Sequence, residues 1–104
     1  MLDKLNAIAV LIANEVEGVS VSVRDLTEVV VSVDYFGELE VTVHEWVRIK
    51  NGRAYRSNRY DVVGVTFDRT HGIDSEELIA ENIEKSQLLA TIRKAVKAYH
   101  YEVA

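Results

Sequence analysis

The chain has 104 residues, of which 48% are hydrophobic and 28% are charged, and its formal net charge is −5. This length allows a single domain, residues 1–104, and the composition excludes an intrinsically disordered chain. Because cysteine and proline are both absent, disulfides, thiolate chemistry, cysteine-based metal sites and proline-rich linkers are excluded as well.

The longest uninterrupted apolar run, residues 7–13, is far shorter than the roughly 20 residues of a membrane-spanning helix. The first residues also lack the basic, apolar and small-residue regions of a secretory signal. We therefore expect a cytoplasmic protein that does not act at a membrane.

The first segment, residues 2–17, has the period of an amphipathic helix. Its apolar residues recur at steps of three and four, and Gly18 follows as a natural helix end. The period then changes to two, which predicts strands at residues 19–24, 29–35 and 39–49. Each of these strands carries valines at odd-numbered positions.

The pair Asn51-Gly52 is the strongest hairpin signal in the chain, since a type I′ turn needs positive φ at both central residues. A fourth strand is therefore expected at residues 53–67. Its apolar residues change parity midway, which predicts a β-bulge near Asp61 or Gly64.

The expected strand pairing follows from the valines. Three-residue loops between the first three strands pair Val21 with Val31 and Val33 with Val41. The odd-numbered residues then share one apolar face, and a slip by one residue would turn these valines to water. The sequence thus predicts a four-stranded antiparallel meander.

The last segment returns to a helical period. Asp74 and Glu77 fit a capping box, with Ile73 and Leu78 as its hydrophobic staple, and a weak region near Lys85 leaves open whether there are one or two helices. The expected fold is an α+β two-layer sandwich of order α-β-β-β-β-α, in which both helices pack on the apolar face. The other face is left to solvent or to a partner.

The charges are distributed unevenly along the chain. Residues 1–45 have a formal charge of −7 and residues 61–104 one of −3, whereas residues 46–60 hold five basic, three aromatic and no acidic side chains. On the side away from the valines, the hairpin is expected to pair His44 with Arg59, Trp46 with Ser57, Arg48 with Tyr55, and Lys50 with Arg53. We also expect a cation–π contact between Arg48 and Tyr55, and a diagonal contact between Trp46 and Tyr55.

Two interpretations fit this basic hairpin. It is a solvated face, in which Lys50 and Arg53 at the tip discourage edge pairing, or it is a docking site, since Trp, Tyr and Arg are enriched at binding hot spots. In the second interpretation, the partner-binding residues of the hairpin 44–59 are Trp46, Arg48, Lys50, Arg53, Tyr55 and Arg59.

A protein partner with an acidic surface is the leading expectation, because an acidic chain repels a long polyanion. Single-stranded nucleic acid or RNA, whose bases would stack on the aromatic residues, is the alternative. Small accessory proteins, including those of phages and mobile elements, often combine helix, meander and helix, so an accessory or inhibitor role also fits. No cofactor is implied, and homodimerisation is left open.

Glu45 falls on the apolar parity, opposite Asn58 and diagonal to Arg56. A partly covered ion pair at the end of the sheet, beyond the helices, explains it; a general acid or base is the functional alternative.

A loop metal is the other chemical alternative. Asp68, His71 and Asp74 are metal-ligand types close together in sequence, although helix capping already accounts for Asp74. Phosphate-binding glycine loops and nucleophile motifs are absent. The sequence therefore predicts a protein that is not an enzyme.

Overall fold

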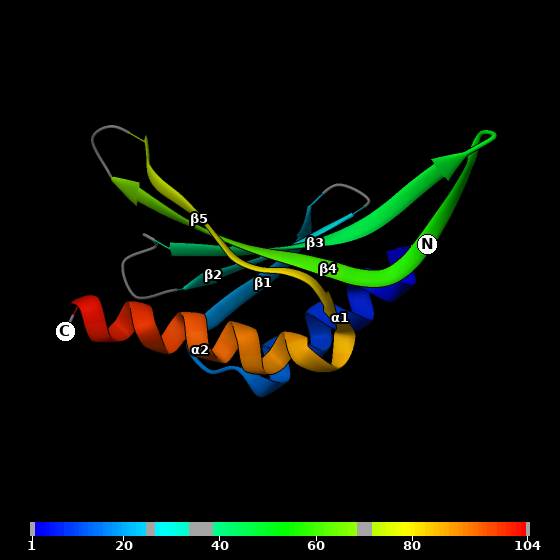
Figure 1. Ribbon diagram of the computed structural model, residues 1–104. Coiled ribbons are helices and arrows are strands. Elements are labelled where there is room, and N and C mark those ends of the chain that lie inside the picture. Colours follow the sequence, from blue (N-terminus) through cyan, green and yellow to red (C-terminus); the bar gives the residue numbers. More distant parts are fainter. Residues whose placement is uncertain (1, 25–26, 34–38, 69–71, 104) are drawn as a thin grey trace.

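The computed structural model describes residues 2–24, 27–33, 39–68 and 72–103 (Figure 1). The fold is α+β, with one antiparallel sheet and two helices at the two ends of the chain. Within the described residues, neither helix is long and apolar enough to cross a membrane. The elements are α1 (Leu2–Glu15), β1 (Val19–Arg24), β2 (Glu28–Val33), β3 (Leu39–Lys50), β4 (Arg53–Asp68), β5 (Gly72–Glu84) and α2 (Lys85–Val103).

Side chains of both helices and of the strands form one hydrophobic core. In Figure 1 the helices run beneath the sheet, where α1 contacts β1 and β2, and α2 contacts β3, β4 and β5. The buried residues of α1 recur at helical spacing, as predicted, and those of β2 and β3 are mainly the odd-numbered valines. The main members of this cluster are Leu5, Ile8, Ile12, Val29, Val31, Val33, Val41, Val43, Tyr60, Val62, Leu88 and Ile92.

The sheet is a meander of order β1-β2-β3-β4-β5, in which each strand pairs with the next. Val21 lies opposite Val31, as predicted. Between β2 and β3, however, Val31 lies opposite Val41, so the predicted pairing of Val33 with Val41 is wrong by two residues. A shift of two residues leaves every side chain on the same face, and hydrophobic parity therefore does not detect it.

The fifth strand is the main departure from the expected fold. The segment that follows Gly72 pairs with β4 instead of starting a helix, so the capping box of Asp74 and Glu77 is wrong. Without β5, the second edge of a 16-residue β4 would carry a row of unpaired backbone groups. Pairing satisfies these groups and also packs Ile79 and Ile83 against the core, which outweighs the local helix signals.

The last helix begins at Lys85, where the sequence pattern is weak. The Glu84 backbone N–H donates to Oε1 of Gln87 at 3.0 Å, so Gln87 acts as the third-position residue of a capping box. A single helix, α2, therefore follows β5 directly.

Candidate binding arm

The end of the β3–β4 hairpin projects from the sheet as a two-stranded ribbon (Figure 1). β2 pairs with β3 no further than His44, and β5 pairs with β4 no further than Arg59. Beyond these residues the two strands pair with each other alone among the described strands. We call residues 46–58 the arm. It contributes to an elongated molecule that measures 48 × 29 × 20 Å.

The tip of the arm has the predicted geometry. Asn51 and Gly52 both have positive φ, 52° and 73°, as a type I′ turn requires. The predicted pairings of Lys50 with Arg53 and of Arg48 with Tyr55 are confirmed.

The base of the arm has a different register. Between Glu45 and Val47, β4 has two residues more than β3, and Asn58 has a φ of 57° there. The pairings at the base are therefore His44 with Asp61 and Glu45 with Tyr60, in place of the predicted Arg59 and Asn58. The bulge predicted in β4 near Asp61 or Gly64 is absent from its pairing with β3, whose register is unbroken from Tyr60 to Thr66. In the pairing of β4 with β5 the register shifts between Tyr60 and Val62, but the extra residue there is on β5.

Trp46 is anchored where β3, β4 and β5 meet. Its indole Nε1–H donates to Oδ1 of Asp61 at 2.7 Å, and the same oxygen accepts the Asn82 backbone N–H at 2.9 Å. The Ser57 hydroxyl donates to the carbonyl oxygen of Trp46 at 3.3 Å. The bond to Asp61 thus holds the indole, and the bond from Ser57 holds the backbone of Trp46, while the residue remains 37% exposed.

A hollow of about 580 Å³ lies beside Trp46. Its lining combines aromatic and apolar surface with a guanidinium and a carboxylate. Two of the predicted site residues line it, together with Asp61, which sequence reasoning missed because the predicted register placed Arg59 instead of Asp61 opposite His44. The residues of the lining are His44, Trp46, Val47, Arg48, Ser57 and Asp61.

The five basic side chains of residues 46–60 do not form one patch. Nη1 of Arg56 lies 2.6 Å from the buried Glu45, and Nη1 of Arg59 lies 3.3 Å from Glu84 on β5. The structure therefore places Arg59 apart from the other predicted site residues, in a surface ion pair. Three exposed cations of the arm have no ion-pair partner in the described part of the chain, and these are Arg48, Lys50 and Arg53.

The exposed apolar surface of the arm comes from Tyr55, which is 51% exposed, and Ile49, which is 75% exposed. Ile49 was expected on the buried face, and it is open because the arm extends past the helices. The structure shows no cation–π contact between Arg48 and Tyr55, so that prediction is wrong. Such a contact contributes only about 0.5–1 kcal/mol at an exposed site, too little to hold two solvated side chains together.

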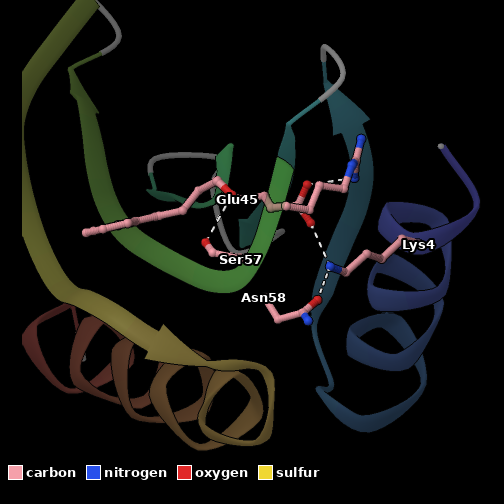
Figure 2. A network of polar contacts seen from close by, with 6 residues as sticks. Lys4, Glu45, Ser57 and Asn58 are labelled. Atoms are coloured by element: carbon pink, nitrogen blue, oxygen red, sulfur yellow. Dashed lines mark hydrogen bonds and ion pairs between the residues drawn. The ribbon is translucent and has the colours of Figure 1, made fainter. Parts of the chain in front are cut away.

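Beneath the base of the arm, Glu45 is fully buried, with 0% exposure, between two cations (Figure 2). Nη1 of Arg56 lies 2.6 Å from Oε1, and Nζ of Lys4 lies 3.1 Å from Oε2. Lys4 also donates to Oδ1 of Asn58. The predicted ion pair of Glu45 and Arg56 is confirmed, but α1 covers it, so its expected place beyond the helices is wrong. This network ties the base of the arm to α1.

Tyr60 is the second buried polar residue of this network. Nζ of Lys4 lies 5.9 Å from the centre of its ring, and its hydroxyl makes no hydrogen bond of normal geometry. Burial raises the pKa of Tyr60 above its ordinary value of 10.0, and the Lys4 ammonium partly opposes this rise. The phenol is therefore held in its neutral form.

The described residues contain no group of three or more His, Cys, Asp or Glu side chains that could hold a metal ion. The predicted loop ligands Asp68, His71 and Asp74 lie outside the side chains that the structure describes. Both carboxylate oxygens of Glu45 already face cations, which suits a structural role better than proton transfer.

Comparison with known proteins gives no relative for this chain: no family model, no curated protein and no solved structure matches it.

Proposed function

We propose that the protein is a non-enzymatic binding protein that docks on an acidic surface of a protein partner through the arm. The observation that carries this proposal is the set of three unpaired cations and two exposed aromatic residues on a ribbon that projects from an acidic molecule. An accessory or inhibitor role, in which the arm covers a surface of the partner, fits this arrangement.

The composition and shape of the arm support docking. Trp, Tyr and Arg are the residues that most often dominate the energy of protein interfaces, and the arm presents all three. Hydrogen bonds to Asp61 and Ser57 fix Trp46 before any partner binds, which lowers the entropy lost on association.

The charge distribution favours a compact acidic patch over a long polyanion. Exposed charges farther apart than about 8 Å are largely screened at physiological ionic strength. The cations near the tip therefore act on a partner that touches the arm, whereas a long nucleic acid would also meet the acidic body. The proposal takes the domain as a two-layer sandwich with both helices on one face, so that the opposite face, with Trp46 and Arg48, is open to the partner.

The proposal can be tested with a glutamate-rich peptide and the fluorescence of Trp46, the only tryptophan in the chain. We expect the peptide to change the emission of the wild-type protein in a saturable way. The variant Arg48→Gln/Arg53→Gln should lose most of this response. The control Lys94→Gln/Lys97→Gln, which removes the same charge from exposed positions of α2, should keep it. Equal losses in both variants would show a general charge effect and contradict the proposal.

A single-stranded oligonucleotide in the same titration tests the alternative. If three cations of the arm each neutralise one phosphate, the logarithm of the affinity should fall with the logarithm of the salt concentration with a slope of about −2. Tighter binding of the oligonucleotide than of the peptide, with this slope, would replace the protein partner by nucleic acid.

A further inference from the structure

The two edges of the sheet, β1 and β5, differ in what protects them from pairing with another chain. β5 pairs with β4 through a register that shifts at three places, and it carries five acidic residues: Asp74, Glu76, Glu77, Glu81 and Glu84. β1 pairs with β2 without any irregularity, and residues 18–23 carry no charge and no proline. Charges, prolines and bulges are the usual means of blocking an edge, and β1 has none of these before its last residue.

We infer that β1 is a dimer interface, which pairs in antiparallel orientation with β1 of a second copy of this chain. The segment Val19–Val23 reads the same in both directions, Val-Ser-Val-Ser-Val. An antiparallel pair around a two-fold axis at Val21 therefore places valine opposite valine and serine opposite serine along its whole length. This symmetry suits a second copy of the same strand better than an unrelated one.

The surface of α1, which packs against β1, is also uncharged over most of its length. α1 packs beneath β1 and β2, so a two-fold pair of β1 strands brings the two α1 helices alongside each other. Residues 5–14 carry no charge, although more than a quarter of the chain is charged. The exposed residues of this stretch are Asn6, Ala7, Val10, Leu11, Ala13 and Asn14.

The charge of the molecule also favours a second copy of this chain as the partner of the β1 edge. Two copies with a net charge of −5 repel each other at most orientations, and they approach most easily where neither surface is charged. Two of the charges that border the edge are paired within one chain: Arg24 lies 3.2 Å from Glu28, and Glu15 lies 3.2 Å from Arg93. The exposed Glu17 precedes the neutral segment and lies outside the strand. The dimer thus buries a neutral edge and leaves the acidic β5 edges at its two ends. It does not depend on the function of the arm.

The register is tested with engineered cysteines, since the natural chain has none. Val21→Cys places the two thiols directly opposite each other, with Cβ atoms about 5 Å apart, so mild oxidation should join two chains by a disulfide. Val23→Cys is the matched control on the same strand and face. Its two copies would lie about 14 Å apart along the strands and should not be joined.

The mass in solution is measured by light scattering for wild type and two charge variants. We expect twice the chain mass of 11.7 kDa for wild type, a monomer for Ser22→Lys, and a dimer for the control Ala90→Lys on the exposed surface of α2. A wild-type monomer at the concentrations used for structural work would overturn the inference. So would a dimer that survives Ser22→Lys, or one in which Val23→Cys is joined and Val21→Cys is not.

Discussion

The network around Glu45 gives the sharpest prediction about stability. Arg56→Ala removes the guanidinium that lies 2.6 Å from Oε1 and leaves a carboxylate with 0% exposure. Lys4 remains 3.1 Å from Oε2, so one charge is still compensated while the second oxygen loses its partner. Removal of one member of a buried pair usually destabilises a protein by about 3–5 kcal/mol. Because Lys4 remains, we expect the lower end, about 3 kcal/mol.

The measurement is urea unfolding, followed by circular dichroism and by Trp46 fluorescence. A loss of about 3 kcal/mol in the free energy of unfolding corresponds to a fall in Tm of about 12 °C or more for a domain of this size. Arg59→Ala is the matched control on the same strand, because its partner is Glu84 and the two side chains are 37% and 65% exposed. A surface pair of this kind contributes about 0–1 kcal/mol. Similar small losses for Arg56→Ala and Arg59→Ala would refute the argument that burial makes the Glu45 pair important.

Tyr60→Phe should leave the free energy of unfolding unchanged or raise it by up to about 1 kcal/mol, because the lost hydroxyl is buried without a normal hydrogen bond. The pKa of Tyr60 is raised in the folded state, so its contribution to stability is complete below about pH 10 and is lost as the pH rises through the folded value. Thermal melts between pH 8 and 11 should therefore fall less steeply for Tyr60→Phe than for wild type, and parallel curves would contradict this. Gln87→Ala should lower stability by about 0.5–1 kcal/mol through loss of its bond to the Glu84 N–H, while Gln87→Glu should restore it in the same urea experiment.

The sequence predicts best where hydrophobic period and turn chemistry act together. The alternating valines place β1, β2 and β3, and Asn51-Gly52 locates the turn of the arm with its positive φ values. Two registers that differ by two residues bury the same side chains. The alternation of apolar residues therefore cannot predict the register of β2 with β3 or the register at the base of the arm.

The missed features depend on contacts between segments distant in sequence. β5 forms because β4 has an unpaired edge, and this is a property of the assembled sheet, whereas Asp74 and Glu77 give only local helix signals. Asp61 reaches Trp46 only in the shifted register of β3 and β4, and it accepts the Asn82 N–H only once β5 is in place. Lys4 reaches Glu45 only after α1 packs beneath the sheet. Five of the six residues of the predicted binding site, all except Arg59, lie together on the arm.

The claim that the arm presents a positively charged surface on an acidic molecule can be measured directly through Trp46, without any partner. Iodide and caesium both quench the fluorescence of exposed tryptophan, and they carry opposite charges. The electrostatic potential near Trp46 therefore raises the local concentration of one ion and lowers that of the other. We predict that iodide quenches Trp46 more strongly than caesium when each ion is compared with its quenching of free tryptophan, and that this preference shrinks in Arg48→Gln/Arg53→Gln but not in Lys94→Gln/Lys97→Gln. Stronger quenching by caesium on the same relative scale in the wild-type protein would show that the acidic body sets the potential at the arm, and would contradict the account.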